Sequence, residues 1–296
     1  MVVISFVENP QEIKALIQLL DDPDEDIYSQ IREKLISCGS DVIPKLEDSW
    51  ENQSFGVLFQ ERIEDIIHSI QFQDVCDRFR SWKQQGAPSL LDGALLLARY
   101  QYADLDEEDV RKRIEKIRQD IWLELNDQLT ALEQVKVINH VLFDIHEFSP
   151  NTKNYHAPQN SFINNVIESR KGNPLSLCML YIILARGLDI PLYGVNLPNH
   201  FVMAYVDHRF ASKRLKYGKE VLFYINAFSR GSVFNHKEIE NFLSQLNIEP
   251  QAQFFSPCSN LDIMVRAVKN LIHAYEKLGY PSKKDELKVI LDILQD

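Results

Sequence analysis

The stretch "GNPLSLCMLYIILARG", residues 172–187, constrains the fold more than any other part of the chain. A proline at the first helical position favours the start of a helix, and the residues that follow are almost all apolar up to Arg186. An apolar helix of this kind belongs in a protein core or in a membrane, and this run is too short to cross a bilayer. We therefore expect a core helix over residues 174–186.

One cysteine, Cys178, lies a turn inside this helix, and two interpretations of it are open. It is either a nucleophile at the positive end of a helix or a small apolar core residue. A low-pKa thiolate needs the unpaired N–H groups of the first turn or a nearby cation. The amide of Cys178 is already paired within the helix, and its neighbours are Leu177 and Met179. This position favours a buried structural thiol.

The remaining patterns predict a predominantly helical α+β protein. Apolar residues recur at helical spacing up to about residue 79 and again between residues 90 and 145. Three short runs, "LYGVNL", "HFVMAYV" and "EVLFYINAF", are typical of strands. Helical patterns return in "NHKEIENFLSQL" and in the last stretch of the chain. We expect a helix packed on a small antiparallel sheet, with helical extensions at both ends.

These patterns divide the chain into three expected domains: a helical segment 1–80, an α+β domain 81–255 and a helical hairpin 256–296. The first contains "LIQLLDDPDEDIYSQIREKLISCGSDVIPKL", which resembles a HEAT-type repeat with an Asp-Pro-Asp corner. A simple helical hairpin is the alternative. The last expected domain, residues 256–296, resembles one tetratricopeptide-type hairpin. Because several repeats normally stack together, one unit of either kind does not identify a repeat protein.

Composition and charge exclude several classes of partner. The formal net charge is −11, which argues against nucleic acid and against an anionic membrane surface. The four cysteines contain no CxxC pair, and no Gly-rich nucleotide motif occurs, so we expect no metal and no cofactor. The first residues lack a basic segment followed by a long apolar one, so we expect a cytoplasmic protein.

The order of the cysteine-bearing helix, a strand that starts at His200 and a strand that ends near Asn226 resembles the transglutaminase-like superfamily. The similarity is specifically to its SirB-type proteins. It is carried by "LLLARYQYADLD", "INHVLFDIHEFSPNTKNYHAPQNSFINNVIESRKGNPLSL", "ARGLDIPLYGVNLPNHFVMAY" and "FYINAFSRG". The resemblance implies a papain/transglutaminase-like core. It also implies that His200 is the general base and later acid of active members, and that Asn226 orients its imidazole.

The same resemblance implies that the nucleophile's position is occupied by Pro174. In active members the nucleophilic cysteine opens the helix, and "GLDIPLYG" here matches the segment that closes it. Counting back along the helix from that segment leads to Pro174 rather than to Cys178. Proline supplies no nucleophile, but it presets the first helical turn, with Asn173 as the N-cap.

Two hypotheses of function follow. The first is a non-catalytic transglutaminase-like module that binds a protein or peptide. Its pocket would be formed around His200 and Asn226 by Gly172, Asn173, Pro174, Ser176, Asn199, Tyr155 and His156. The second is a cysteine peptidase or acyl-transfer hydrolase that uses Cys178, His200 and Asn226. A scaffold protein is a third possibility. His200 could instead be a hydrogen-bonded structural histidine. Ser176 is a weaker candidate nucleophile than Cys178.

Overall fold

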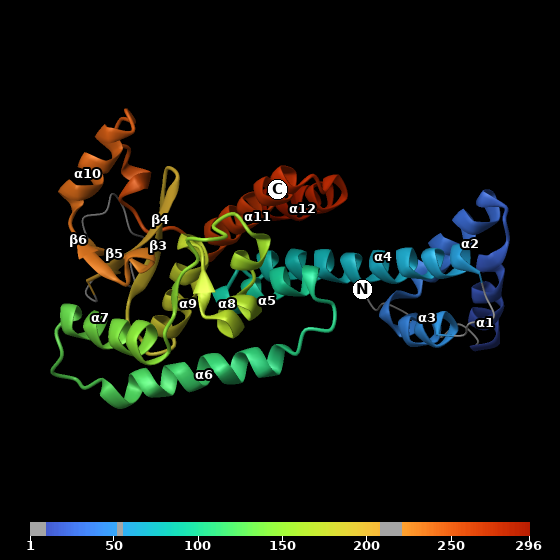
Figure 1. Ribbon diagram of the computed structural model, residues 1–296, viewed down its shortest axis with the longest axis horizontal. Coiled ribbons are helices and arrows are strands. Elements are labelled where there is room, and N and C mark those ends of the chain that lie inside the picture. The colour runs from blue at the N-terminus through green and yellow to red at the C-terminus, as the bar shows by residue number, and fades with distance from the viewer. Residues whose placement is uncertain (1–9, 52–55, 208–220) are drawn as a thin grey trace. The chain divides into compact units, whose positions relative to one another are not determined.

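The computed structural model describes residues 10–51, 56–207 and 221–296 (Figure 1). The chain divides into two compact units, Met1–Arg78 and Phe79–Asp296. The division into three domains stays a prediction.

The first unit consists of short helices around an apolar core. Its elements are α1 (Pro10–Gln18), η1 (Leu19–Asp21), α2 (Glu25–Ser37), η2 (Gly39–Val42), α3 (Ile43–Trp50) and most of α4 (Val57–Gln84). The chain breaks at the Asp-Pro-Asp corner, where the side chain of Asp24 caps α2 by accepting from the amides of Asp26 and Ile27. Asp at an N-cap satisfies donors that have no partner within the helix. The HEAT-type interpretation stays a prediction.

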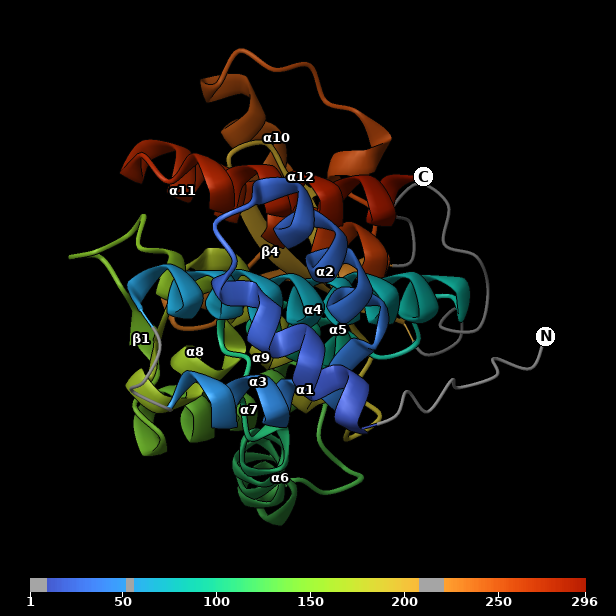
Figure 2. The same ribbon diagram turned by 90° about the vertical axis from the view of Figure 1, so that its right-hand side faces the viewer.

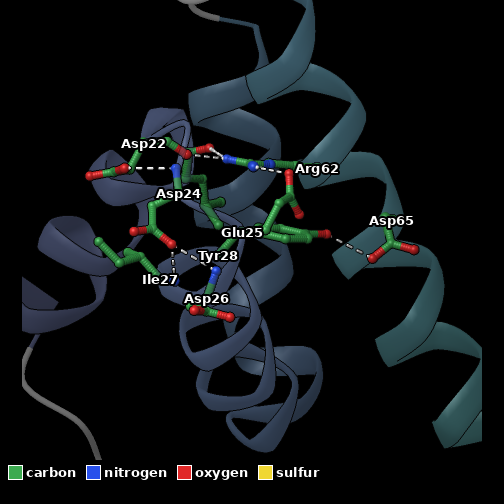
Figure 3. Close-up of polar contacts among 9 residues, drawn as sticks. Asp22, Asp24, Glu25, Asp26, Ile27, Tyr28, Arg62 and Asp65 are labelled. Carbon is green, nitrogen blue, oxygen red and sulfur yellow. Dashed lines mark hydrogen bonds and ion pairs between the residues drawn. The ribbon is translucent and has the colours of Figure 1, made fainter.

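A buried arginine holds this corner together (Figure 3). Arg62, on α4, is only 4% exposed. Its Nη1 donates to the carbonyl oxygens of Leu20 at 2.9 Å and Asp22 at 2.5 Å, and its Nη2 donates to Glu25 at 2.8 Å. The guanidinium therefore satisfies backbone carbonyls at the end of η1 that would otherwise lack partners.

The second unit is α+β, as the sequence predicts. Its helices are the end of α4, α5 (Leu90–Gln101), α6 (Glu107–Glu124), α7 (Ala131–Asn139), α8 (Ile163–Ser169), α9 (Pro174–Arg186), α10 (His236–Gln245), α11 (Asn260–Leu278) and α12 (Pro281–Gln295). A π-helical turn, η3 (His140–Ile145), follows α7, and 3-10 turns form η4 (Pro158–Ser161), η5 (Ala227–Ser229) and η6 (Ala252–Phe254).

The strands form two sheets. The antiparallel sheet has the order β3 (Leu192–Leu197), β4 (His200–Val206), β5 (Val221–Asn226) and β6 (Ser232–Phe234). A minimal parallel pair joins β1 (Ser149–Pro150) to β2 (Lys171–Gly172), directly before α9. The expected small antiparallel sheet is confirmed, and the predominantly helical α+β class with it.

The apolar helix α9 lies in the core of this unit. It packs on β3 and β4 and contacts α5, α6, α8 and α11. Figures 1 and 2 both show α6 on one side of α9 and α11 on the other. A second core contains Val195, Leu197, Val202, Ala204 and Tyr224 of the sheet, together with Ile239 and Leu243 of α10. Strands β3 and β4 are therefore covered on both faces, which explains their nearly continuous apolar sequences, whereas Leu222 of β5 and Val233 of β6 are exposed.

Candidate functional site

A cavity of about 250 Å³ opens where the start of α9, the β3–β4 turn, the loop before η4 and α11 meet. All of its lining residues belong to the second unit. They are Tyr155, His156, Ala157, Ser161, Asn173, Pro174, Leu175, Asn199, His200, Phe201, Arg266, Asn270, His273 and Ala274. The wall is mostly polar and contains one arginine and three histidines, but no aspartate or glutamate.

The start of α9 is fixed by a reciprocal capping box. The Asn173 side chain accepts from the amide of Ser176 at 2.9 Å, and the Ser176 hydroxyl accepts from the amide of Asn173 at 3.0 Å. A Cβ at Gly172 would lie 2.7 Å from that hydroxyl oxygen, so only glycine fits there. Gly172 and Ser176 therefore build the helix start and do not line the cavity, whereas Asn173 and Pro174 do.

Pro174 is the first residue of α9, and it lines the cavity together with His200. A proline offers no thiol, no hydroxyl and no backbone N–H. At the point where the first helical turn meets the cavity, this residue supplies only a ring of apolar carbon.

Cys178 does not line the cavity and lies in the core, next to β4. Its side chain is 0% exposed, and its sulfur lies 3.6 Å from the carbonyl oxygen of Phe201. Burial raises the pKa of the Cys178 thiol to about 12, although a hydrogen bond with the backbone of Ala227 lowers it in part. The structure thus places this residue as a buried thiol, in agreement with the favoured interpretation of its helical position.

His200 stands at the first position of β4, directly after a tight turn. Asn199 in this turn adopts φ +56°, and Leu197 and His200 face each other across the hairpin. Burial lowers the pKa of His200, a hydrogen bond with the Asn226 side chain raises it, and the charge of Arg266 lowers it, with a net decrease. The lowered pKa favours the neutral imidazole, which presents one donor and one acceptor nitrogen.

Asn226 lies at the end of β5, beside His200 but outside the lining of the cavity. Its Oδ1 also accepts from the amide of Phe228 at 3.0 Å, and its Nδ2 donates to Ser229 at 3.1 Å. These contacts hold the amide in place next to the imidazole. The structure thus brings His200 and Asn226 together and leaves Cys178 apart from the cavity that His200 lines.

The loop before η4 supplies the rim of the cavity through Tyr155 and His156, which are both exposed. The buried side chain of Asn160 holds this loop. Its Nδ2 donates to the carbonyl oxygens of Asn154 at 2.7 Å and Tyr155 at 3.1 Å, and its Oδ1 accepts from Asn151 at 2.8 Å. The rim is therefore a fixed part of the site, tied to the pair of strands that precedes α9.

Helix α11 contributes a wall of the cavity that was not predicted from the sequence. Arg266, Asn270 and His273 lie at spacings of four and three residues, which place them on one helix face. Arg266 donates from Nη1 to Asn196 at 2.6 Å and to the carbonyl oxygen of Leu197 at 3.3 Å, next to the β3–β4 turn. A polar row beside the apolar face of a helix was the signal that could have revealed them.

Within the described ranges 10–51, 56–207 and 221–296, no group of three or more His, Cys, Asp or Glu side chains is arranged to hold a metal. The three histidines of the cavity are thus not placed as a ligand set. In the same ranges, none of the helices combines the length and the apolar character needed to span a bilayer.

Comparisons with known proteins agree with this architecture. Residues 108–269, more than half of the chain, match the Transglutaminase-like superfamily. A UPF0162 protein of Xylella fastidiosa (strain Temecula1) is 31% identical over 192 residues, which are 63% of this chain and 64% of that protein. A UPF0162 protein of Pseudomonas aeruginosa is 26% identical over 212 residues, 70% of this chain and 73% of that protein.

The mouse protein F-box only protein 21 is 24% identical over 255 residues, which are 77% of this chain but only 39% of that protein. The chain therefore spans less than two thirds of the length of the Xylella relative and of this mouse protein. No solved structure matches the chain.

Proposed function

Because the chain belongs to the transglutaminase-like superfamily, we propose that it is a member without a catalytic thiol, which binds a protein or peptide in the cavity at the start of α9. The observation that carries this proposal is Pro174, the first residue of α9, which lines the cavity together with Leu175 and His200, and neither Pro174 nor Leu175 carries a nucleophile. Acyl transfer through a covalent intermediate needs a nucleophile next to the base, and proline is none. We also propose that the protein is of the SirB type, because segments such as "ARGLDIPLYGVNLPNHFVMAY" and "FYINAFSRG" resemble those proteins.

The cavity offers groups that suit a peptide. The neutral His200 and the side-chain amides of Asn199 and Asn270 present both donors and acceptors, which match the N–H and C=O groups of a peptide backbone. A volume of about 250 Å³ is at the small end of ligand pockets, so it suits one side chain or a chain end better than a large cofactor.

The alternative enzyme, with Cys178, His200 and Asn226 as its catalytic residues, receives no support from the geometry. A thiol that is 0% exposed and has a pKa of about 12 is neither accessible nor ionised near pH 7.

The test uses a pool of short synthetic peptides incubated with the full chain, followed by mass spectrometry of bound and free fractions. We expect peptides to be retained reversibly and recovered unchanged. His200→Gln should weaken retention, whereas Cys178→Ala, a change in the core, should leave it unaltered. Cleaved peptides or an acylated chain, lost in Cys178→Ala, would show that the protein is an enzyme instead.

A further inference from the structure

We propose that the cavity recognises a carboxylate group of its ligand and that Arg266 is the charged contact. This inference rests on the proposed function, because it names the chemical class of peptide that the same site takes. The chain carries a formal net charge of −11, yet no acidic residue lines this cavity.

Arg266 is half-buried, and in the described part of the chain no carboxylate lies within ion-pair distance of it. Its Nη1 donates to the side chain of Asn196 and the carbonyl oxygen of Leu197, which are both neutral acceptors. No described residue accepts from its Nε or Nη2. A guanidinium has five N–H donors in a planar fork, so those that remain are available to a bidentate acceptor such as a carboxylate.

The nearest acidic residue along α11 is Asp262, four residues before Arg266, and it serves another purpose. Its carboxylate accepts from the amide of Ser259 at 2.9 Å and from the Ser259 hydroxyl at 2.7 Å, as part of the capping box of α11. Asp262 and Arg266 line a neighbouring pocket together, but within the described residues no ion pair joins them. Burial lowers the pKa of Arg266, and the charge of nearby Tyr155 raises it in part, with a net decrease.

The groups around Arg266 are suited to the rest of a carboxylate ligand. Asn270 and His273 lie on the same helix face, and His200 lies across the cavity. Each of these side chains can donate a hydrogen bond to an oxygen anion, and none carries a negative charge that would repel it. A peptide can supply such a group as its C-terminal carboxylate or as an Asp or Glu side chain, and the two sources share one chemistry.

Three small probes distinguish these sources. N-acetyl-alanyl-alanine carries a C-terminal carboxylate, N-acetyl-glutamate α-amide carries only a side-chain carboxylate, and N-acetyl-alanyl-alaninamide is neutral. Each is titrated into the isotope-labelled full chain at pH 7, and the NMR signals of the Arg266 Nε–H group and of the histidine rings are followed. We expect saturable shifts with one or both carboxylate probes and affinity at least about tenfold weaker for the neutral probe.

Arg266→Gln should reduce the affinity for the carboxylate probe by about tenfold or more while the affinity for the neutral probe changes little. The matched control is Arg113→Gln, which removes an exposed arginine of α6, paired with Asp109, from the same unit. Equal binding of the neutral and charged probes to the unaltered chain overturns the carboxylate proposal and leaves peptide binding in place. This comparison needs no variant, so it holds even if Arg266→Gln fails to fold. If none of the three probes binds, peptide binding at this cavity is refuted as well.

Discussion

The burial of Cys178 predicts a very slow reaction with alkylating agents in the native protein. Burial raises the pKa of this thiol from an ordinary 9.0 to about 12. Since 12 − 9 is three pKa units, the thiolate fraction near pH 8 falls by about a thousandfold. The side chain is also 0% exposed, so reagent reaches it only after local opening. Because the exposed thiol regains an ordinary pKa, the cost of opening replaces the first factor and does not multiply it, and an opening that costs about 4 kcal/mol slows the reaction by roughly a thousandfold.

The assay is a time course of iodoacetamide labelling between pH 7 and pH 9, quenched and resolved by mass spectrometry of each cysteine peptide. Cys38 is partly exposed and should be labelled at a rate at least about a thousandfold above that of Cys178. Cys258 separates the two causes of protection, because its pKa is also raised to about 12 while its side chain keeps partial exposure. The labelling rate of Cys258 should fall between those of Cys38 and Cys178.

The control is the same reaction in concentrated urea, where the labelling rates of all four cysteines should converge. The reasoning is refuted if Cys178 is labelled fast and selectively in the native protein, with an apparent pKa well below ~8.5. An activated thiolate would then exist despite the observed burial, and the enzyme hypothesis would return.

Three further predictions concern stability. Gly172→Ala should lower the free energy of unfolding by about 1–3 kcal/mol, because the new methyl group overlaps the buried hydroxyl of Ser176. Gly56→Ala, which has open space around it, should not lower it, and urea unfolding followed by circular dichroism compares the two variants. Arg62→Met should destabilise the first unit by about 2–4 kcal/mol through the loss of charged hydrogen bonds to two carbonyls, and amide hydrogen exchange there should rise. The control is Arg78, an exposed arginine of α4 that pairs with Asp74: Arg78→Met should change the free energy of unfolding by less than ~1 kcal/mol. Equal effects of Arg62→Met and Arg78→Met would contradict the structural role assigned to Arg62. Because the folded-state pKa of His200 is lowered, its stabilising contribution is fully present above about pH 6.5 and is lost as the pH falls below that value. His200→Gln should therefore flatten the decrease in the free energy of unfolding between pH 7 and pH 5, measured by urea unfolding at each pH. An unchanged slope would contradict this role of His200.

Much of the second unit could be predicted from local sequence. The observed bounds of α9, β3 and β4 agree with the quoted runs, because Pro174, Pro191 and the Pro198-Asn199 turn mark their ends sharply. The strands β1, β2 and β6 were not predicted. Each has two or three residues, which is too short for a period of two to be recognised.

The candidate site was predictable only in part, and for a physical reason. Asn173 and His200 sit at the ends of recognisable elements, so resemblance and turn chemistry point to them. Ser176 was expected in the pocket, but its hydroxyl and amide are engaged in the capping box. Arg266 contacts Asn196 from 70 residues further along the chain, and no local pattern reports a contact of that separation. The α11 wall therefore emerged only from the tertiary structure.

The supply of one cavity wall by α11 has a consequence for how the site could be controlled. The α11–α12 hairpin is packed as a pair, and a ligand that touches Arg266 and His200 together would bridge this hairpin to the sheet. Occupancy and hairpin docking are then thermodynamically linked: a ligand tightens the hairpin, and anything that pulls the hairpin away empties the cavity. Slower amide exchange along α11 and α12 would therefore report occupancy of a cavity whose other walls lie earlier in the chain, at the Tyr155 loop, the start of α9 and the β3–β4 turn.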